Sequence, residues 1–272
     1  MVEVPEKAKL AFACAGIFFS FSYFAVLQED VYKKPYSGEY FKYTFLALVC
    51  ERGINAAIGA LGVLLLGGSG LKIPLLDILW SGTSQMFAMA GSNEALRYVS
   101  YPTQVLGKSC KMVPVMAGGV VLGGKKYSGF EYFQVFLITL GVCIFNLMGK
   151  KKKGGEDSLL GLCLIGFSLV MDAVTGGLQD KVKKRTKELN PEAGEKPVPT
   201  MHESMLWTNL SGTIVAFALA IVTGQISSGL AFCMRNPEVI NAILVYSLAS
   251  AVGQVAAPPP APPPARGEPG PR

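Results

Sequence analysis

Charged residues are scarce in this sequence. Lys, Arg, Asp and Glu together make up 16% of its 272 residues, where an ordinary soluble domain carries about 25%. Half of the residues are hydrophobic and the mean hydropathy is +0.38. This composition excludes a typical soluble domain and predicts a membrane protein.

The excess of basic residues is too dispersed along the sequence to indicate nucleic-acid binding. The formal net charge is +6, but the lysines form short clusters between apolar runs, such as GKKKKGG at 149–155 and KVKKRTK at 181–187. Basic loops that flank membrane helices explain these clusters better. We therefore predict contact with the lipid bilayer and no nucleic-acid partner.

Metal-binding and catalytic patterns are absent from the sequence. It has one histidine, His202, and six cysteines, none of them in the CxxC or Cys/His spacing of a zinc site. We interpret the cysteines as reduced packing residues. The sequence therefore predicts no enzyme, no catalytic residue, no metal and no cofactor.

Long apolar runs recur along the chain. About 20 apolar residues cross the hydrocarbon core of a bilayer, and eight segments qualify: 8–28, 41–66, 74–98, 102–122, 129–148, 158–180, 203–224 and 238–256. The polar segment 181–202 between two of them contains proline and should be an exposed loop. The predicted fold is an all-α membrane protein, a polytopic helical bundle whose transporter domain covers residues 1–256.

The end of the sequence has a different composition. After Gln254 it reads VAAPPPAPPPARGEPGPR, and proline at this density cannot continue a helix. We expect residues 257–272 to be a disordered tail rich in Pro and Ala. Since Ala, Pro, Gly and Arg have GC-rich codons, we also hypothesise that the natural coding sequence continues as an apolar segment after Gln254.

Two lysines lie inside the apolar segment 102–122. Lys108 and Lys111 share a helical face, because Gln104, Lys108, Lys111, Val115 and Gly118 are spaced by four, three, four and three residues. Pro114 has no N–H, so the carbonyl of Cys110 loses its usual donor and the helix should kink there. The pattern predicts a polar, positively charged surface within the membrane.

Buried lysines need a negatively charged partner. One interpretation is structural pairing, with Asp172 or Glu51 neutralising one lysine, or snorkelling to the interface. We favour an anionic ligand for part of the charge, and two ammonium groups one turn apart suit a diphosphate. Four further polar side chains are candidates to line the same cavity, although each also fits a packing role: Tyr23, Gln28, Asn93 and Gln179.

A weak internal similarity links the two halves of the chain. Leu27-Gln28-Glu29 and Leu178-Gln179-Asp180 lie 151 residues apart, near the ends of two predicted helices. Repeated halves leave traces of this kind in transporters, but three residues also match by coincidence, and both interpretations stay open.

Three stretches carry a resemblance to a known family. NEALRYVSYPTQVLGKSCKMVPVM at 93–116, AVLQED at 25–30 and MDAVTGGLQDKV at 171–182 resemble the UDP-galactose transporter-related branch of the nucleotide-sugar transporters. This is the UAA transporter family, with solute carrier 35 subfamily B, in the drug/metabolite transporter superfamily. The similarity extends over about residues 10–254, and YPTQVLGKSCK is quite specific to this branch.

The resemblance implies a fold and a transport activity. Such transporters have ten helices in two inverted five-helix halves and both termini in the cytosol. The implied function is a nucleotide-sugar antiporter that moves UDP-galactose or UDP-glucose from the cytosol into the lumen of the endoplasmic reticulum or Golgi in exchange for a nucleotide monophosphate. The implied alternative is an ATP/ADP exchanger of the endoplasmic reticulum membrane. A homodimer is an open alternative for its assembly.

The resemblance of the YPTQVLGKSCK motif also implies where the substrate would bind in this chain. By resemblance, Lys108 and Lys111 would face the central cavity and neutralise phosphate, with Gln104, Asn93, Tyr23, Gln28, Asp172 and Gln179 as the other candidate substrate-binding residues. Only eight of the ten helices of the family are recognisable. A further alternative therefore stays open, that this chain by itself is a transport-defective membrane protein whose cavity lacks one wall.

Overall fold

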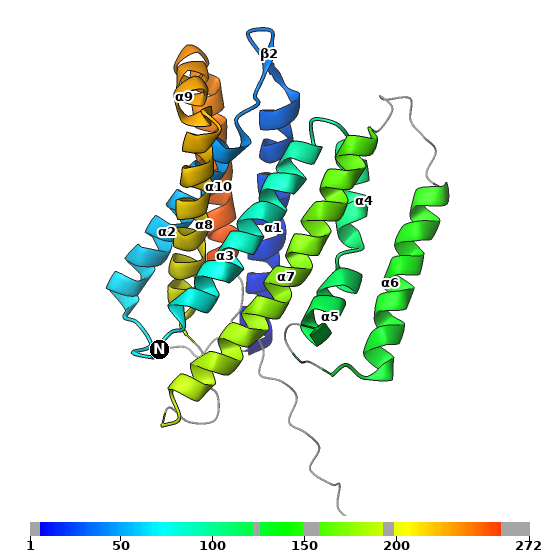
Figure 1. The fold of residues 1–272 in the computed structure, drawn as a ribbon, viewed down its shortest axis with the longest axis vertical. Coiled ribbons are helices and arrows are strands. Elements are labelled where there is room, and N and C mark those ends of the chain that lie inside the picture. Colours follow the sequence, from blue (N-terminus) through cyan, green and yellow to red (C-terminus); the bar gives the residue numbers. More distant parts are fainter. Residues whose placement is uncertain (1–5, 122–123, 125, 149–157, 193–198, 257–272) are drawn as a thin grey trace, which may run out of the picture.

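The computed structural model describes residues 6–121, 124, 126–148, 158–192 and 199–256. This part of the chain contains ten α-helices and one short β-hairpin (Figure 1). The elements are α1 Glu6–Lys33, β1 Pro35–Tyr36, β2 Glu39–Tyr40, α2 Thr44–Leu66, α3 Leu75–Ala95, α4 Tyr101–Ser109, α5 Met112–Val121, α6 Gly129–Met148, α7 Leu159–Leu189, α8 Met201–Val222, α9 Gln225–Arg235 and α10 Pro237–Ala256. The predicted tail at 257–272 and the lysine cluster at 149–155 lie outside the described residues.

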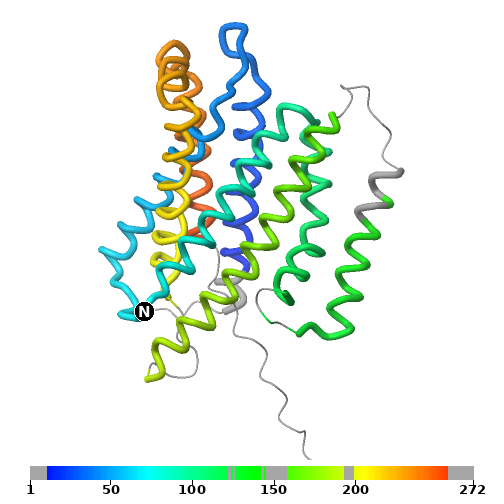
Figure 2. The backbone as a smooth tube through the Cα atoms, in the orientation of Figure 1, coloured from blue at the N-terminus to red at the C-terminus, as the bar shows by residue number. Residues whose placement is uncertain are grey.

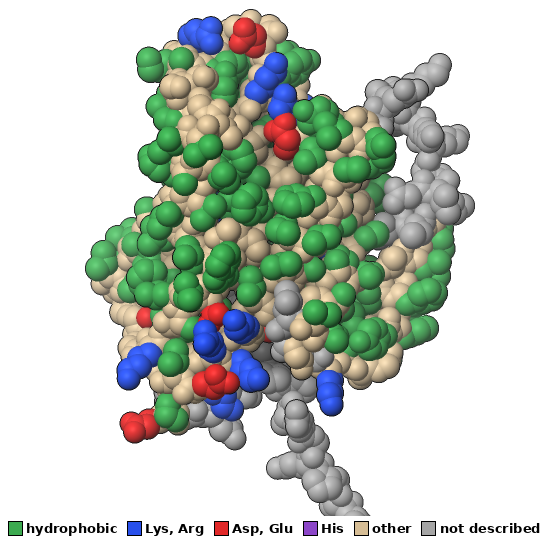
Figure 3. Space-filling model, in the orientation of Figure 1, with side chains coloured by type: hydrophobic (Ala, Val, Ile, Leu, Met, Phe, Trp, Pro, Cys, Tyr) green, Lys and Arg blue, Asp and Glu red, His purple; other side chains and the backbone are tan. Residues whose placement is uncertain are grey.

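The predicted helical membrane fold is confirmed in its main features. Five of the described helices are long and apolar enough to cross a membrane: α1 over Ala11–Lys33, α2, α7, α8 and α10. On the face seen in Figure 3, hydrophobic side chains cover the middle of the molecule, while charged side chains gather towards its two ends. That distribution is the one a lipid-embedded bundle needs. Eight spans remain a prediction.

The segment predicted as one helix over 102–122 forms two helices. Helix α4 begins after Ser100, whose hydroxyl accepts a hydrogen bond from the N–H of Thr103, and the chain turns at 110–111 before α5. Because Pro114 has no N–H, the carbonyl of Cys110 accepts instead from the N–H of Val113 at 3.2 Å. The predicted disruption at Cys110 is therefore confirmed, but it breaks the helix and does not merely kink it.

Two helices extend further than the sequence indicates. Helix α1 continues past residue 28 to Lys33 and ends just before Pro35. Helix α7 continues to Leu189, so the exposed loop predicted from residue 181 is wrong over 181–189. Polar composition suggested a loop there, but Lys181 and Arg185 lie one turn apart and both pair with the buried carboxylate of Asp77 on α3, at 3.0 and 2.7 Å.

A hairpin and a short helix close one end of the bundle, and the sequence analysis predicted neither. Ser37 and Gly38 have φ of 51° and 85°, which matches the left-handed pair that a tight two-residue hairpin turn requires. Helix α9 places Phe232 against Tyr36 and Phe41 of the hairpin region. Together with Tyr32 and Tyr246 they form the largest buried aromatic cluster of the described residues.

The long helices pack in a regular set of pairs. Helix α2 packs on α8, α3 on α7, and α1 on α10, while α3 also contacts α8 and α10 also contacts α2. Figure 2 shows α1 and α10 side by side, although they come from opposite ends of the sequence. Helix α5 packs on α7, and α6 stands at the edge of the bundle, in contact with α4 and α5.

We predict that the contact between α5 and α7 depends on Gly118. A Cβ atom at Gly118 would overlap the backbone carbonyl of Ala173, and backbone cannot move away as a flexible side chain can. Gly118→Ala should therefore lower the free energy of unfolding by about 1–3 kcal/mol. Thermal unfolding of the detergent-purified protein measures this.

Gly166 on α7 provides the matched control. A Cβ atom there meets nothing within 4 Å, and replacing a helical glycine by alanine stabilises a helix by roughly 0.5–1 kcal/mol. Equal melting temperatures for Gly118→Ala and Gly166→Ala would contradict the packing of α5 on α7.

Candidate functional site

A polar cavity of about 380 Å³ lies between the C-terminal part of α1, the end of α3, and α4. Polar side chains make up nearly all of its lining. The lining residues are Gln28, Ser92, Tyr101, Gln104, Val105, Lys108, Ser109 and Lys111. Four of the predicted substrate-binding residues, Gln28, Gln104, Lys108 and Lys111, are therefore brought together in one place.

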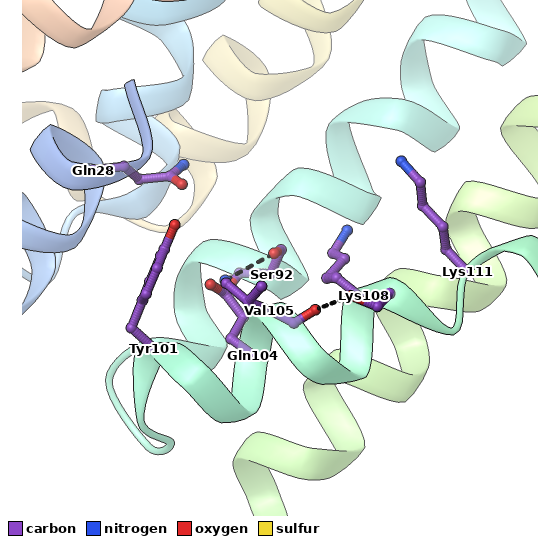
Figure 4. Close-up of a pocket in the computed structure, with 8 residues that line it drawn as sticks. Gln28, Ser92, Tyr101, Gln104, Val105, Lys108 and Lys111 are labelled. Atoms are coloured by element: carbon purple, nitrogen blue, oxygen red, sulfur yellow. Dashed lines mark hydrogen bonds between the residues drawn. The ribbon is translucent and has the colours of Figure 1, made fainter. Parts of the chain in front are cut away.

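Lys108 lies near the end of α4, and Lys111 lies in the turn between α4 and α5. In Figure 4, Lys108 and Lys111 extend in the same direction from the end of α4 and from the turn that follows it. The Nζ atom of Lys108 contacts Oδ2 of Asp172 on α7 at 2.9 Å, and each of these side chains is about a quarter exposed (25% and 24%). Asp172, and not Glu51, is thus the carboxylate that pairs with a lysine of this site.

Lys111 has no counterion in the described part of the chain. It is exposed, and no acidic side chain among the described residues forms an ion pair with it. The described lining of the cavity contains no acidic residue. It therefore carries two basic side chains and no carboxylate, an arrangement that attracts anions.

Hydrogen-bonded amide side chains line the part of the cavity away from the lysines. Gln104 is buried and donates from Nε2 to the carbonyl and the hydroxyl oxygen of Ser92 at 2.6 and 2.9 Å. Gln28 donates from Nε2 to Oδ1 of Asn93 at 2.9 Å, which joins α1 to α3. Asn93 is itself 2% exposed, so it positions Gln28 and does not line the cavity.

Two predicted residues lie elsewhere. Tyr23 is 54% exposed on α1, and Gln179 is exposed on α7. Neither is in the cavity lining. Their helices were identified correctly, but which side of a helix meets the cavity depends on how the helix is rotated against its neighbours, and this was not predicted.

The sequence analysis missed Ser92, Tyr101, Val105 and Ser109. The signal for Tyr101 was present, because this residue precedes Gln104 by three positions and Lys108 by seven, and so shares their helical face. Tyr101 and Gln28 face each other across the cavity (Figure 4). Ser92 had no such signal, since its contribution depends on how α3 approaches α4.

Comparison with known proteins identifies the family. The model of the UAA transporter family matches residues 9–257. Solute carrier family 35 member B1 of Gallus gallus is 34% identical over 258 residues, which cover 92% of this chain and 76% of that protein. The protein of the same name in Danio rerio is 33% identical over 259 residues, covering 92% and 75%.

A plant protein adds a relative with a named activity. The UDP-galactose/UDP-glucose transporter 5 of Arabidopsis thaliana is 29% identical over 269 residues, which cover 93% of this chain and 73% of that protein. These relatives imply a multi-pass membrane transporter and not an enzyme. Because the family model matches nearly the whole chain, the protein belongs to the UAA transporter family.

Proposed function

We propose that this protein is an antiporter of nucleotide sugars and that the cavity beside α4 binds the substrate. The observation that carries the proposal is the juxtaposition of Lys108 and Lys111 in one polar cavity, with Lys111 free of any described acidic partner. A diphosphate offers several oxygens over the distance between two ammonium groups one turn apart. The named activity of the plant relative supports UDP-galactose or UDP-glucose as the substrate.

Each part of the cavity has a distinct role in this proposal. Lys111 makes the first contact with phosphate, and Lys108 joins it when the phosphate displaces Asp172. Tyr101 lies seven residues before Lys108, about 10 Å along a helix, which suits the distance from a diphosphate to a base or sugar. The ring of Tyr101 and the amides of Gln28 and Gln104 would contact that end of the substrate.

The packing of the helices supports an inverted repeat. Suppose that α1 corresponds to α7, α2 to α8, and α3 to α10. The contact of α1 with α10 then has its counterpart in the contact of α7 with α3. Likewise, the contact of α2 with α10 has its counterpart in the contact of α8 with α3. The contact of α2 with α8 is its own counterpart. The two helices of each corresponding pair also run in opposite directions (Figure 1).

This correspondence gives the paired Leu-Gln-acid triplets a structural meaning. It relates Gln28 on α1 to Gln179 on α7, and because the helices are antiparallel the two residues belong to opposite ends of the bundle. We therefore infer transport by the rocking of two related halves around a site near the middle of the membrane. We place the protein in the membrane of the endoplasmic reticulum or Golgi, in keeping with the resemblance of its motif.

Exchange of ATP for ADP is the competing transport activity. The lysines recognise phosphate and do not distinguish bases, so the charge of the cavity suits both substrates.

We predict that Lys111→Ala weakens substrate binding by roughly tenfold to a hundredfold. Hydrogen bonds to charged groups contribute about 1.5–3 kcal/mol, and about 1.4 kcal/mol corresponds to tenfold in affinity. Binding of labelled UDP-galactose to purified protein measures the change. Lys126→Ala removes an exposed loop lysine as the control and should leave binding nearly unchanged; equal losses would place the phosphate site elsewhere.

We predict that Asp172→Asn has opposite effects on stability and on affinity. Without the carboxylate, Lys108 loses its counterion, so the melting temperature of the substrate-free protein should fall. Phosphate no longer competes with Asp172, so substrate should bind more tightly and raise the melting temperature by more than in the unmodified protein.

Thermal unfolding with and without UDP-galactose tests both effects. Asp30→Asn, at an exposed position of α1, is the matched control. Weaker binding by Asp172→Asn would mean that Asp172 contacts the substrate directly and is not displaced by it.

We predict that unlabelled UDP-galactose and UDP-glucose, but not ATP, prevent uptake of labelled UDP-galactose into proteoliposomes. The reason is that the base and sugar must also fit the part of the cavity around Tyr101. Stronger competition by ATP would favour adenine-nucleotide exchange. A folded protein that takes up neither substrate would contradict the transport proposal.

A further inference from the structure

A second group of buried polar side chains lies between α2 and α10, outside the lining of the cavity. Glu51 is 1% exposed and Asn55, one turn further along α2, is completely buried. Ser250 on α10 contacts both of them: its hydroxyl donates to Oε1 of Glu51 at 3.2 Å and accepts from Nδ2 of Asn55 at 3.3 Å. The nucleotide-transport proposal uses none of these three residues.

The neighbouring arginine does not neutralise Glu51. Arg52 is 2% exposed, but its guanidinium points to neutral acceptors: Nη1 donates to Oε1 of Gln85 on α3 at 3.0 Å and to Oδ1 of Asn209 on α8 at 3.2 Å. No ion pair joins Glu51 to a basic group in the described part of the chain. An ionised carboxylate inside the bundle would therefore have one serine hydroxyl as its hydrogen-bond donor.

Two acceptor atoms in this group have no donor. They are Oε2 of Glu51 and Oδ1 of Asn55, both fully buried. Leaving a buried polar atom unsatisfied costs about 1–3 kcal/mol, and more for a charged group. Residues four apart on a helix lie on the same face, about 5–6 Å between their Cβ atoms, and Ser250 holds both head groups on the α10 side.

We propose that Glu51 is a proton-binding site inside the helical bundle. A proton on Oε2 removes the charge and turns one unsatisfied acceptor into a donor, which reaches Oδ1 of Asn55, while Oε1 continues to accept from Ser250. One proton therefore satisfies both atoms. A metal cation fits less well, because Glu51 is the one carboxylate of this group and the described residues contain no cluster of three or more His, Cys, Asp or Glu side chains that could hold a metal ion.

The surroundings make the protonation state sensitive to how the helices pack. The titratable groups that interact with Glu51 are Arg52 on its own helix, Tyr246 on α10 and Tyr32 on α1. The thiol of Cys50 on α2 lies near Tyr246 and near the thiol of Cys233 on α9. Helices α3 and α8 contribute the neutral amides of Gln85 and Asn209.

Hydrogen bonds connect the proposed proton site to the interface between the two proposed halves of the bundle. Ser250 also accepts from Gln254 at 3.4 Å, and Gln254 accepts from Asn209 at 3.0 Å. The group thus joins α2 and α10 to α8, which are helices of both proposed halves. Loss of the proton places a negative charge between α2 and α10 and leaves two acceptors without donors, so it should favour separation of these helices. The protonation itself does not depend on which substrate is transported.

Infrared spectroscopy of the purified protein in lipid tests this proposal. A protonated carboxyl group has a carbonyl band distinct from those of a carboxylate. We expect such a band at neutral pH, its loss in Glu51→Gln, and its retention in Glu94→Gln. Glu94 is the matched control, because both of its oxygens receive hydrogen bonds, from Arg97 and from Thr44.

Stability gives a second measurement. The folded protein holds a proton that an exposed carboxyl loses at about pH 4.3. The melting temperature of the unmodified protein and of Glu94→Gln should therefore fall as the pH rises from about 5 to the pH at which Glu51 ionises. Glu51→Gln, which cannot ionise, should lose this part of the pH dependence.

Two results overturn the proposal. One is a spectrum without a protonated carboxyl band at neutral pH; the other is a band that Glu51→Gln leaves unchanged. Either would mean that Glu51 is ionised, with the Asn55 amide turned to donate to it. If Glu51→Gln does not fold, Ser250→Ala provides the readout, because loss of the hydrogen bond to Oε1 should move the Glu51 band to higher frequency; an unmoved band excludes Glu51 as its source.

Discussion

The missing N–H of Pro114 is the constraint on which the candidate site depends. It removes the donor that would continue the helix through Cys110, and the chain turns between α4 and α5. Lys108, near the end of α4, and Lys111, within the turn, then both line one cavity. Beyond the turn, α5 is free to pack Gly118 closely against α7. One proline thus separates the proposed substrate-binding part of this segment from the part that packs on α7.

Charges inside the bundle are treated in three different ways. Asp77 is buried but receives two basic side chains, which attach the polar end of α7 to α3. Lys108 has a single partner, Asp172, in a half-open position where an incoming anion can replace it. Among the described residues, Glu51 forms no ion pair and receives a hydrogen bond from one hydroxyl group. In our interpretation the first arrangement is structural, the second binds phosphate and the third binds a proton.

The proposed substrate site and the proposed proton site occupy different interfaces of one bundle. The substrate site lies among α1, α3 and α4, whereas Glu51 lies between α2 and α10. Helices α1 and α10 pack on each other, so a movement of α10 away from α2 also affects the helix that supplies Gln28. Rocking of the two halves would therefore connect the two sites through direct helix contacts.

The sequence by itself determined the membrane class, the positions of most helices, the break near Cys110 and four residues of the cavity, because hydrophobic runs, proline and helical spacing act locally. Tertiary structure decided that Asp172 and not Glu51 pairs with Lys108, that Asp77 makes residues 181–189 helical, and that Tyr23 and Gln179 lie outside the cavity. The physical reason is that the rotation of each helix about its axis, and the partner that meets each buried charge, depend on neighbouring helices distant in the sequence.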